Sequence, residues 1–190
     1  MSSLPIFLFN SPILNTNLSI ELLQQEHINC CLRISAEVFG LDYHHPLNFD
    51  LFNKDHYYLV AKKNNKVIGF SILLKLSKKE MEKITEDHLK LTFPSYYLID
   101  VIAISQKEQK KGIGTAILQK ILTKIDAKLP LYSIAWKDKY GINIEKLFNN
   151  HNIKSRINLG RVWAHGCNEK FKCNSYNIHC RCEGVLFKLN

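Results

Sequence analysis

The segment from Tyr96 to Ile125 constrains the fold more than any other part of the chain. It begins with the run YYLIDVIAIS, which is almost wholly apolar and predicts a central strand buried on both faces. A lysine-rich turn with two glycines follows (residues 105–114, called the glycine turn below). An apolar stripe at helical spacing comes next, made up of Ile117, Leu118, Ile121, Leu122 and Ile125. A strand, a tight turn and an amphipathic helix in this order predict an α/β domain.

The part of the chain before this segment supplies three strands and two helices. LSIELLQQ (18–25) predicts a short strand that leads into a helix ending at Gly40. The run from His56 to Leu76 predicts a β-hairpin, because Asn64-Asn65 tolerates the positive φ values of a tight turn. SKKE (77–80) matches a capping box, and the apolar pattern extends that helix to Leu91.

The part after it predicts three more strands and one helix. LYSIAW (131–136) is a strand, INIEKLFNNH (142–151) a helix, and GRVWAHG (160–166) and GVLFKLN (184–190) are two final strands. The resulting order β-α-β-β-α-β-α-β-α-β-β predicts one α/β domain over residues 1–190, with a single sheet.

Composition limits the class of protein and its partners. At 190 residues, with 46% apolar and 23% charged residues, the chain is long enough for one domain with its own core. No apolar run is long enough to span a bilayer, and the first fifteen residues lack the basic n-region of a secretion signal. We therefore expect a cytoplasmic protein without a membrane partner. The net charge of +9 favours anionic partners, which include nucleic acid and phosphorylated small molecules.

The glycine turn has the composition of an anion site. The first turn of a helix leaves backbone N–H groups unpaired at the positive end of the helix dipole, and glycine lets an anion approach them. Lys107, Lys110 and Lys111 would attract that anion. The alternative is a plain strand-to-helix turn with solvated lysines. The pattern is neither a G-x-G-x-x-G dinucleotide motif, since Ile117 stands at the third glycine position, nor a P-loop.

The segment LIDVIAISQKEQKKGIGTAILQKIL resembles the acetyl-CoA motif of the GNAT superfamily of N-acetyltransferases. That motif is Gln/Arg-x-x-Gly-x-Gly/Ala after the fourth strand, and Gln109, Gly112 and Gly114 occupy its defining positions. The order of elements agrees with the family from Leu18 to the C-terminus. The resemblance implies a mixed, mostly antiparallel sheet flanked by helices and acetyl transfer from acetyl-CoA to an amine.

The resemblance also implies which residues would bind acetyl-CoA. Backbone amides in the second half of the glycine turn and at the residue after it would hold the pyrophosphate, namely those of Gln109, Lys110, Lys111, Gly112, Ile113, Gly114 and Thr115. Main-chain groups of Ile102, Ala103 and Ile104 would pair with the pantetheine arm. Asn143 and Phe148 would lie near the thiol end.

The catalytic residues are harder to assign. Acetyl transfer needs a base for the amine proton. We expect Asp100 to be that base, because it interrupts an apolar strand and by strand alternation shares a face with Ile102 and Ile104. The alternative is a structural aspartate at the rim of the sheet. The tyrosine that often protonates the thiol in this family is replaced by Phe148, and Tyr140 is a possible substitute.

A cysteine cluster near the C-terminus predicts a structural zinc site. Cys167, Cys173, Cys180 and Cys182 stand within sixteen residues, and four thiolates suit tetrahedral zinc. We place this insertion at residues 165–183, between the last two strands. Free thiols and disulfides are the alternatives, and His179 could replace Cys180 as a ligand. Cys30 and Cys31 fit a helix and are expected to be core and near-surface residues.

These observations predict a GNAT-type N-acetyltransferase with acetyl-CoA as cosubstrate and a zinc-bearing insertion. The alternative is a non-catalytic protein of the same fold that binds coenzyme A or nucleic acid. Neither the acceptor amine nor the oligomeric state follows from the sequence.

Overall fold

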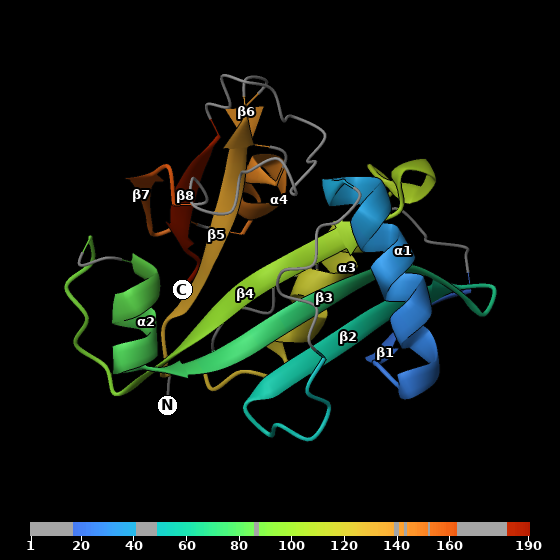
Figure 1. The fold of residues 1–190 in the computed structure, drawn as a ribbon, viewed down its shortest axis with the longest axis horizontal. Helices are drawn as coiled ribbons and strands as arrows, with labels where there is room; N and C mark the ends of the chain where they lie inside the picture. The colour runs from blue at the N-terminus through green and yellow to red at the C-terminus, as the bar shows by residue number, and fades with distance from the viewer. Residues whose placement is uncertain are drawn as a thin grey trace, which may run out of the picture.

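A computed structural model describes residues 17–40, 49–85, 88–138, 141–142, 144–151, 153–162 and 182–190. These residues form one sheet in the order β1-β2-β3-β4-β5-β8-β7, with β6 paired to β5 (Figure 1). The strands are β1 (Leu18–Leu22), β2 (His56–Lys63), β3 (Lys66–Ser77), β4 (Ser95–Ile104), β5 (Leu131–Asp138), β6 (Gly141–Ile142), β7 (Ser155–Gly160) and β8 (Glu183–Lys188). In the described residues β4 and β5 are parallel and every other pair is antiparallel, as expected.

Helices cover both faces of this sheet. They are α1 (Ile28–Phe39), α2 (Lys78–Thr85), α3 (Ile113–Leu122) and α4 (Glu145–Asn149). In Figure 1, α1 and α2 lie in front of the sheet, α3 lies behind it and α4 lies beside β5. The predicted central strand is β4, whose side chains belong to the buried clusters on both faces. None of the described helices has the length and apolarity that crossing a bilayer requires.

Two local predictions are confirmed at atomic detail. The hairpin of β2 and β3 turns at Asn64 and Asn65, whose φ values are 50° and 62°. The capping box closes in both directions: the Ser77 amide donates to the Glu80 carboxylate at 2.8 Å, and the Glu80 amide donates to Ser77 Oγ at 3.3 Å. Both features depend on residues close in sequence, which is why the sequence revealed them.

The helix after the capping box is shorter than predicted. We expected it to reach Leu91, but α2 ends at Thr85. The Thr85 hydroxyl donates to the Met81 carbonyl at 2.9 Å in the last turn, so a side chain takes up one of the helix-end carbonyls. Leu91 is still buried in the same cluster as Met81, and it reaches that cluster from a loop. The apolar spacing therefore indicated burial correctly and the helix length wrongly.

The strand predicted at residues 160–166 differs at its start, and residues 163–166 lie outside the described residues. The observed strand β7 ends at Gly160, where φ is 70°, and it pairs antiparallel with β8. In β7 only Ile157 and Leu159 supply the apolar half of the alternating pattern, and the polar residues around them kept the sequence from indicating a strand there. The two-residue strand β6 was not predicted, and Leu122, expected on the buried stripe of α3, is 39% exposed.

The predicted positions of the two adjacent cysteines in α1 are confirmed. Cys31 is fully buried, and burial together with the neighbouring Cys30 raises the pKa of its thiol to about 12. Cys30 is partly exposed, and its sulfur accepts a hydrogen bond from Arg33 at 3.3 Å. Cys31 is thus a core residue with an unreactive, neutral thiol.

Candidate functional site

The strands β4 and β5 separate after a short parallel ladder. They pair only from Tyr97 to Ile99 on β4, against Leu131 to Ser133 on β5, and then diverge (Figure 1). The Ser133 hydroxyl donates to the Ile99 carbonyl at 3.0 Å and so closes the ladder. We call the diverging segments, residues 100–104 of β4 and 134–137 of β5, the fork. Within the described chain, the β5-facing edge of β4 has no strand partner in the fork, so its main chain suits an extended ligand.

A β-bulge in β4 marks the point of separation. Ile72 of β3 pairs with Val101 and Leu73 pairs with Ile99, so Asp100 is the extra residue. A bulge bends its strand and increases the local twist, which explains why β4 turns away from β5 there. The glycine turn lies directly beyond the fork, at the end of β4.

The backbone of the glycine turn takes left-handed conformations at two places. Gly112 has φ 80°, as its lack of a side chain allows, and Lys110 has φ 61°, which the sequence did not reveal. Gly112 is the N-cap of α3 and no side chain caps it. The first helical bond runs from the Ala116 amide to the Gly112 carbonyl at 3.0 Å. The amides of residues 113–115 thus precede the hydrogen-bonded ladder, at the positive end of the helix.

Gly114 is the point where three elements meet. A Cβ atom on Gly114 would lie 3.4 Å from Ile104 Cδ1 at the end of β4 and 3.4 Å from Leu147 Cδ2 on α4. A Cβ atom on Gly112 would have no neighbour within 4 Å. We call the end of the fork next to the glycine turn, at Ile104, Gly112 and Gly114, the mouth of the fork. It exposes backbone at Gly112 and is closely packed at Gly114.

The lysines of the glycine turn differ in their contacts. Lys111 Nζ lies 2.6 Å from the Lys107 carbonyl and 3.3 Å from the Glu108 carboxylate. Glu108 also pairs with Lys63 of β2 at 3.1 Å, and the two lysines hold the pKa of that carboxyl below its usual value. Lys107 and Lys110 are exposed. The positive charge expected here is present, although Lys111 is turned toward Glu108.

The residues predicted to bind the cosubstrate lie together at this end of the sheet. Ile102, Ala103 and Ile104 are the last residues of β4, next to the turn. The Gln109 side chain donates to the Ile104 carbonyl at 2.9 Å, so this side chain fastens the turn to the strand. Asn143 and Tyr140 lie outside the described residues.

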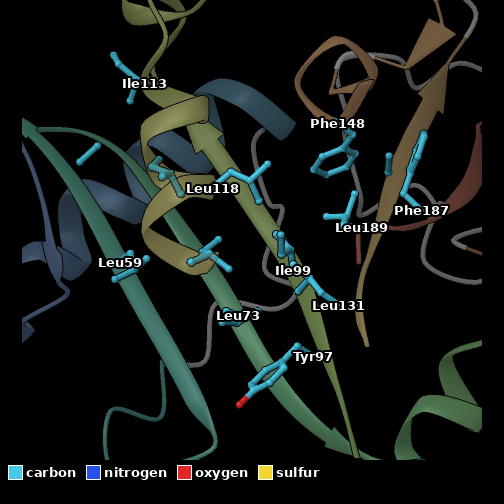
Figure 2. Close-up of a cluster of buried hydrophobic side chains, with 14 of the residues drawn as sticks. Leu59, Leu73, Tyr97, Ile99, Ile113, Leu118, Leu131, Phe148, Phe187 and Leu189 are labelled. Atoms are coloured by element: carbon cyan, nitrogen blue, oxygen red, sulfur yellow. The ribbon is translucent and has the colours of Figure 1, made fainter. Parts of the chain in front are cut away.

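Phe148 is a core residue. It is completely buried, and its ring centroid lies 5.3 Å from that of Phe187 in the cluster between α3, α4 and the sheet (Figure 2). The ring packs among apolar side chains and carries no group that transfers a proton.

The bulge changes what strand alternation implies for Asp100. Leu98 before the bulge and Val101 after it belong to clusters on the same face of the sheet, the face covered by α1 and α2. Alternation is broken between them, so the expected shared face of Asp100 with Ile102 and Ile104 does not follow from spacing.

A polar group on the α1 side of β2 lies within electrostatic reach of Asp100, and the sequence did not reveal it. Tyr58 Oη accepts the Asp50 amide at 3.1 Å and lies 3.0 Å from His56 Nδ1. Burial raises the pKa of the Tyr58 phenol, the Asp50 amide opposes the rise, and the charges of Asp50 and Asp100 add to it. Strand residues such as His56 and Tyr58 gave no signal, because the hairpin pattern accounted for them.

On the other side of the fork, Trp136 presents a buried donor. Its indole Nε1 is buried and has no hydrogen-bond partner within the ranges that the structure describes. An unpaired buried donor costs about 1–3 kcal/mol.

The predicted zinc ligands fall almost entirely outside the described residues. Of the four cysteines, only Cys182 is described, and it is buried directly before β8. Among the described residues, no group of three or more His, Cys, Asp or Glu side chains could hold a metal ion. The zinc site remains a prediction.

Comparison with known proteins gives one family match and many structural matches. The model of the acetyltransferase (GNAT) family matches residues 22–139. No curated protein matches the chain.

Three solved structures illustrate the structural similarity. An N-acetyltransferase from Staphylococcus aureus Mu50 has a TM-score of 0.59 at 16% identity, over 92% of this chain and 99% of that one. Arabidopsis thaliana NAA60 in complex with a bisubstrate analogue has a TM-score of 0.64 at 12% identity, over 90% and 96%; it has also been solved with acetyl-CoA. The ribosomal-protein-S18-alanine N-acetyltransferase from Escherichia coli has a TM-score of 0.57 at 12% identity, over 90% and 92%. At these identities the similarity establishes the fold.

Proposed function

Because this chain belongs to the GNAT family of acetyltransferases, we propose that it transfers an acetyl group from acetyl-CoA to a primary amine. One observation carries the proposal: the uncapped first turn of α3, behind left-handed Gly112, lies directly beside the unpaired edge of β4. A diphosphate needs converging backbone amides and an extended arm needs a free strand edge. Both are found at adjoining positions.

The glycine turn, the start of α3 and the β4 side of the fork together fit such a cosubstrate. The amides of Ile113, Gly114 and Thr115 would bind the pyrophosphate, aided by the dipole of α3 and by exposed Lys110. The main chain of Ile102 and Ala103 would hold the pantetheine arm. When bound, acetyl-CoA supplies the activated acetyl thioester, and the chain's own task is to orient it and to accept a proton.

We propose Asp100 as the group that accepts the amine proton. It stands at the bulge where the fork begins, and its charge acts on the buried phenol of Tyr58. A carboxylate at the junction of the two strands is close to where an arm lying along β4 would end. Phe148 has no hydroxyl and cannot protonate the leaving thiolate, and the alternative donor, Tyr140, lies outside the described residues.

The function is tested by following thiol release from acetyl-CoA with a panel of amines: a polyamine, an aminoglycoside, a peptide with a free N-terminus, a lysine peptide and an aminoacyl-tRNA. We expect acceptor-dependent release with one of these classes. Salt-dependent binding to nucleic acid without any thiol release would contradict the proposal and favour a binding protein of the same fold.

Replacing Asp100 with asparagine is expected to lower kcat/KM by about 100-fold, the lower end of what a general base contributes. A base must be deprotonated to act, so the parent rate should rise with pH through the pKa of the base. The variant should lose that rise. Asp126→Asn is the matched control, because Asp126 is an exposed loop residue beyond α3 that caps the Lys128 amide. An Asp100→Asn profile equal to that of the parent would eliminate Asp100 as the base.

We also propose that the cysteine cluster binds one structural zinc ion in a reducing, cytoplasmic setting. β7 and β8 are paired neighbours, so both ends of the intervening segment are held together at Gly160 and Gly184. Four thiols in a segment anchored in this way suit a closed tetrahedral site. Cys182, the one cysteine of this cluster among the described residues, is buried.

Elemental analysis of the purified chain is expected to find about one zinc per chain. Cys182→Ser should lower that content and the unfolding temperature, and Cys30→Ser in α1 should change neither. A parent protein without stoichiometric zinc would refute the metal site and leave free thiols or disulfides as the alternatives.

A further inference from the structure

Glu37 in the last turn of α1 reaches across the end of the sheet to the residues that follow β4. Its Oε1 accepts the Gln106 amide at 2.7 Å and the Ser105 hydroxyl at 3.2 Å. Hydrogen bonds to an ionised carboxylate are about twice as strong as neutral ones. One side chain therefore connects helix α1 to the first two residues of the glycine turn.

The main chain of Glu37 takes part as well. The Gln106 side-chain amide donates to the Glu37 carbonyl at 3.1 Å. Carbonyls in the last turn of a helix have no partner within the helix, so this bond also completes the end of α1. Three hydrogen bonds thus connect one residue of α1 to two consecutive residues of the turn.

The glycine turn needs such external support. It contains two left-handed residues, Lys110 and Gly112, and left-handed conformations cost free energy at a non-glycine residue. Two further contacts hold it: Glu108 pairs with Lys63 of β2, and Gln109 bonds the Ile104 carbonyl. Glu37 fixes the entry to the turn and the other two contacts fix its middle.

We propose that Glu37 is a positioning residue that presets the glycine turn for the diphosphate, so that α1 and the turn act as one unit. The inference rests on the proposed function, because it assigns the turn to coenzyme A. Aligning the amides before binding saves the entropy of ordering them on binding. Loss of the Glu37 contacts should therefore weaken affinity for coenzyme A and leave the chemical step intact.

The experiment titrates coenzyme A into the full chain by calorimetry, for the parent, Glu37→Ala and Glu37→Gln. Both variants remove the same charge, but glutamine keeps an oxygen that can accept the Gln106 amide. We expect Glu37→Ala to bind about tenfold more weakly, equivalent to about 1.4 kcal/mol. Glu37→Gln should stay within about threefold of the parent, because the two charge-assisted bonds to Oε1 become neutral ones but are not lost. Glu82→Ala, which removes a partly exposed helical glutamate paired with Lys78 on α2, is the control for an ordinary surface change.

Two further readouts separate positioning from a general loss of structure. With acetyl-CoA varied, KM should rise in Glu37→Ala while kcat at saturation stays unchanged. Hydrogen exchange of a peptide covering residues 105–112 should be faster in Glu37→Ala without ligand. If Glu37→Ala does not fold, the double variant Ser105→Ala with Gln106→Ala removes two of the three hydrogen bonds and takes its place.

The outcomes distinguish the two proposals. A parent that binds coenzyme A, together with a Glu37→Ala variant that binds it equally well or exchanges no faster at residues 105–112, overturns the role of Glu37 alone. A parent protein that shows no binding of coenzyme A in the calorimeter overturns the proposed function and this inference together.

Discussion

Replacing Gly114 with valine is expected to lower kcat/KM for acetyl-CoA by at least about 100-fold, equivalent to about 2.7 kcal/mol, while the chain stays folded. A Cβ atom at this position already reaches van der Waals contact with Ile104 and Leu147. The two methyl groups of valine would then project into the mouth of the fork or push these neighbours apart. Valine is no worse than glycine in a helix, so α3 should form normally. The measurement is thiol release at varied acetyl-CoA, with calorimetry of coenzyme A binding.

Gly114→Ala is the matched control for this prediction. Its single methyl group would sit at an ordinary contact distance of 3.4 Å, so activity should stay within a few-fold of the parent. Alanine should also favour α3, because glycine is about 1 kcal/mol less favourable in a helix. A valine variant that binds coenzyme A as tightly as the parent would show that the cosubstrate does not pass this point.

Replacing Phe148 with alanine is expected to destabilise the protein by about 3–5 kcal/mol, the range for removing a large buried aromatic side chain. Phe148 is fully buried against Phe187, and its removal would leave a cavity beside α3 and α4. For a chain of this length the unfolding temperature should fall by about 6–20 °C. Phe52→Ala is the control, because Phe52 is 96% exposed and should change the free energy of unfolding by no more than about 0.5 kcal/mol.

Phe148→Tyr tests whether this position could carry the thiol proton. The family resemblance places a tyrosine here, but the ring of Phe148 is enclosed by apolar side chains (Figure 2). A hydroxyl added to that cluster would lack a partner among the described residues and cost about 1–3 kcal/mol. We expect lower stability and no gain in thiol release. A faster variant of unchanged stability would contradict this placement of the ring.

Features that depend on neighbouring residues were predictable from the sequence. Asn64-Asn65 sets its own turn geometry, Ser77 and Glu80 cap one helix, and the strand–turn–helix of residues 96–122 follows from apolar spacing and glycine. The same stretch carries the family motif, so the family and the place of the cosubstrate could be predicted together. Each of these signals lies within a few residues of the chain, where local geometry decides conformation.

The tertiary structure decided the features that depend on how distant segments meet. The bulge at Asp100 arises from the register of β4 against β3, and alternation along one strand cannot reveal it. The contact of Glu37 with Gln106 joins residues 69 apart in the chain, and the burial of Phe148 depends on Phe187 from the last strand. Side-chain chemistry at such positions is set by the neighbours that the fold brings near. The sequence of this protein therefore determined its family and the location of the glycine turn that we propose as the cosubstrate site, whereas the anchoring of that turn and the surroundings of the proposed base required the assembled sheet.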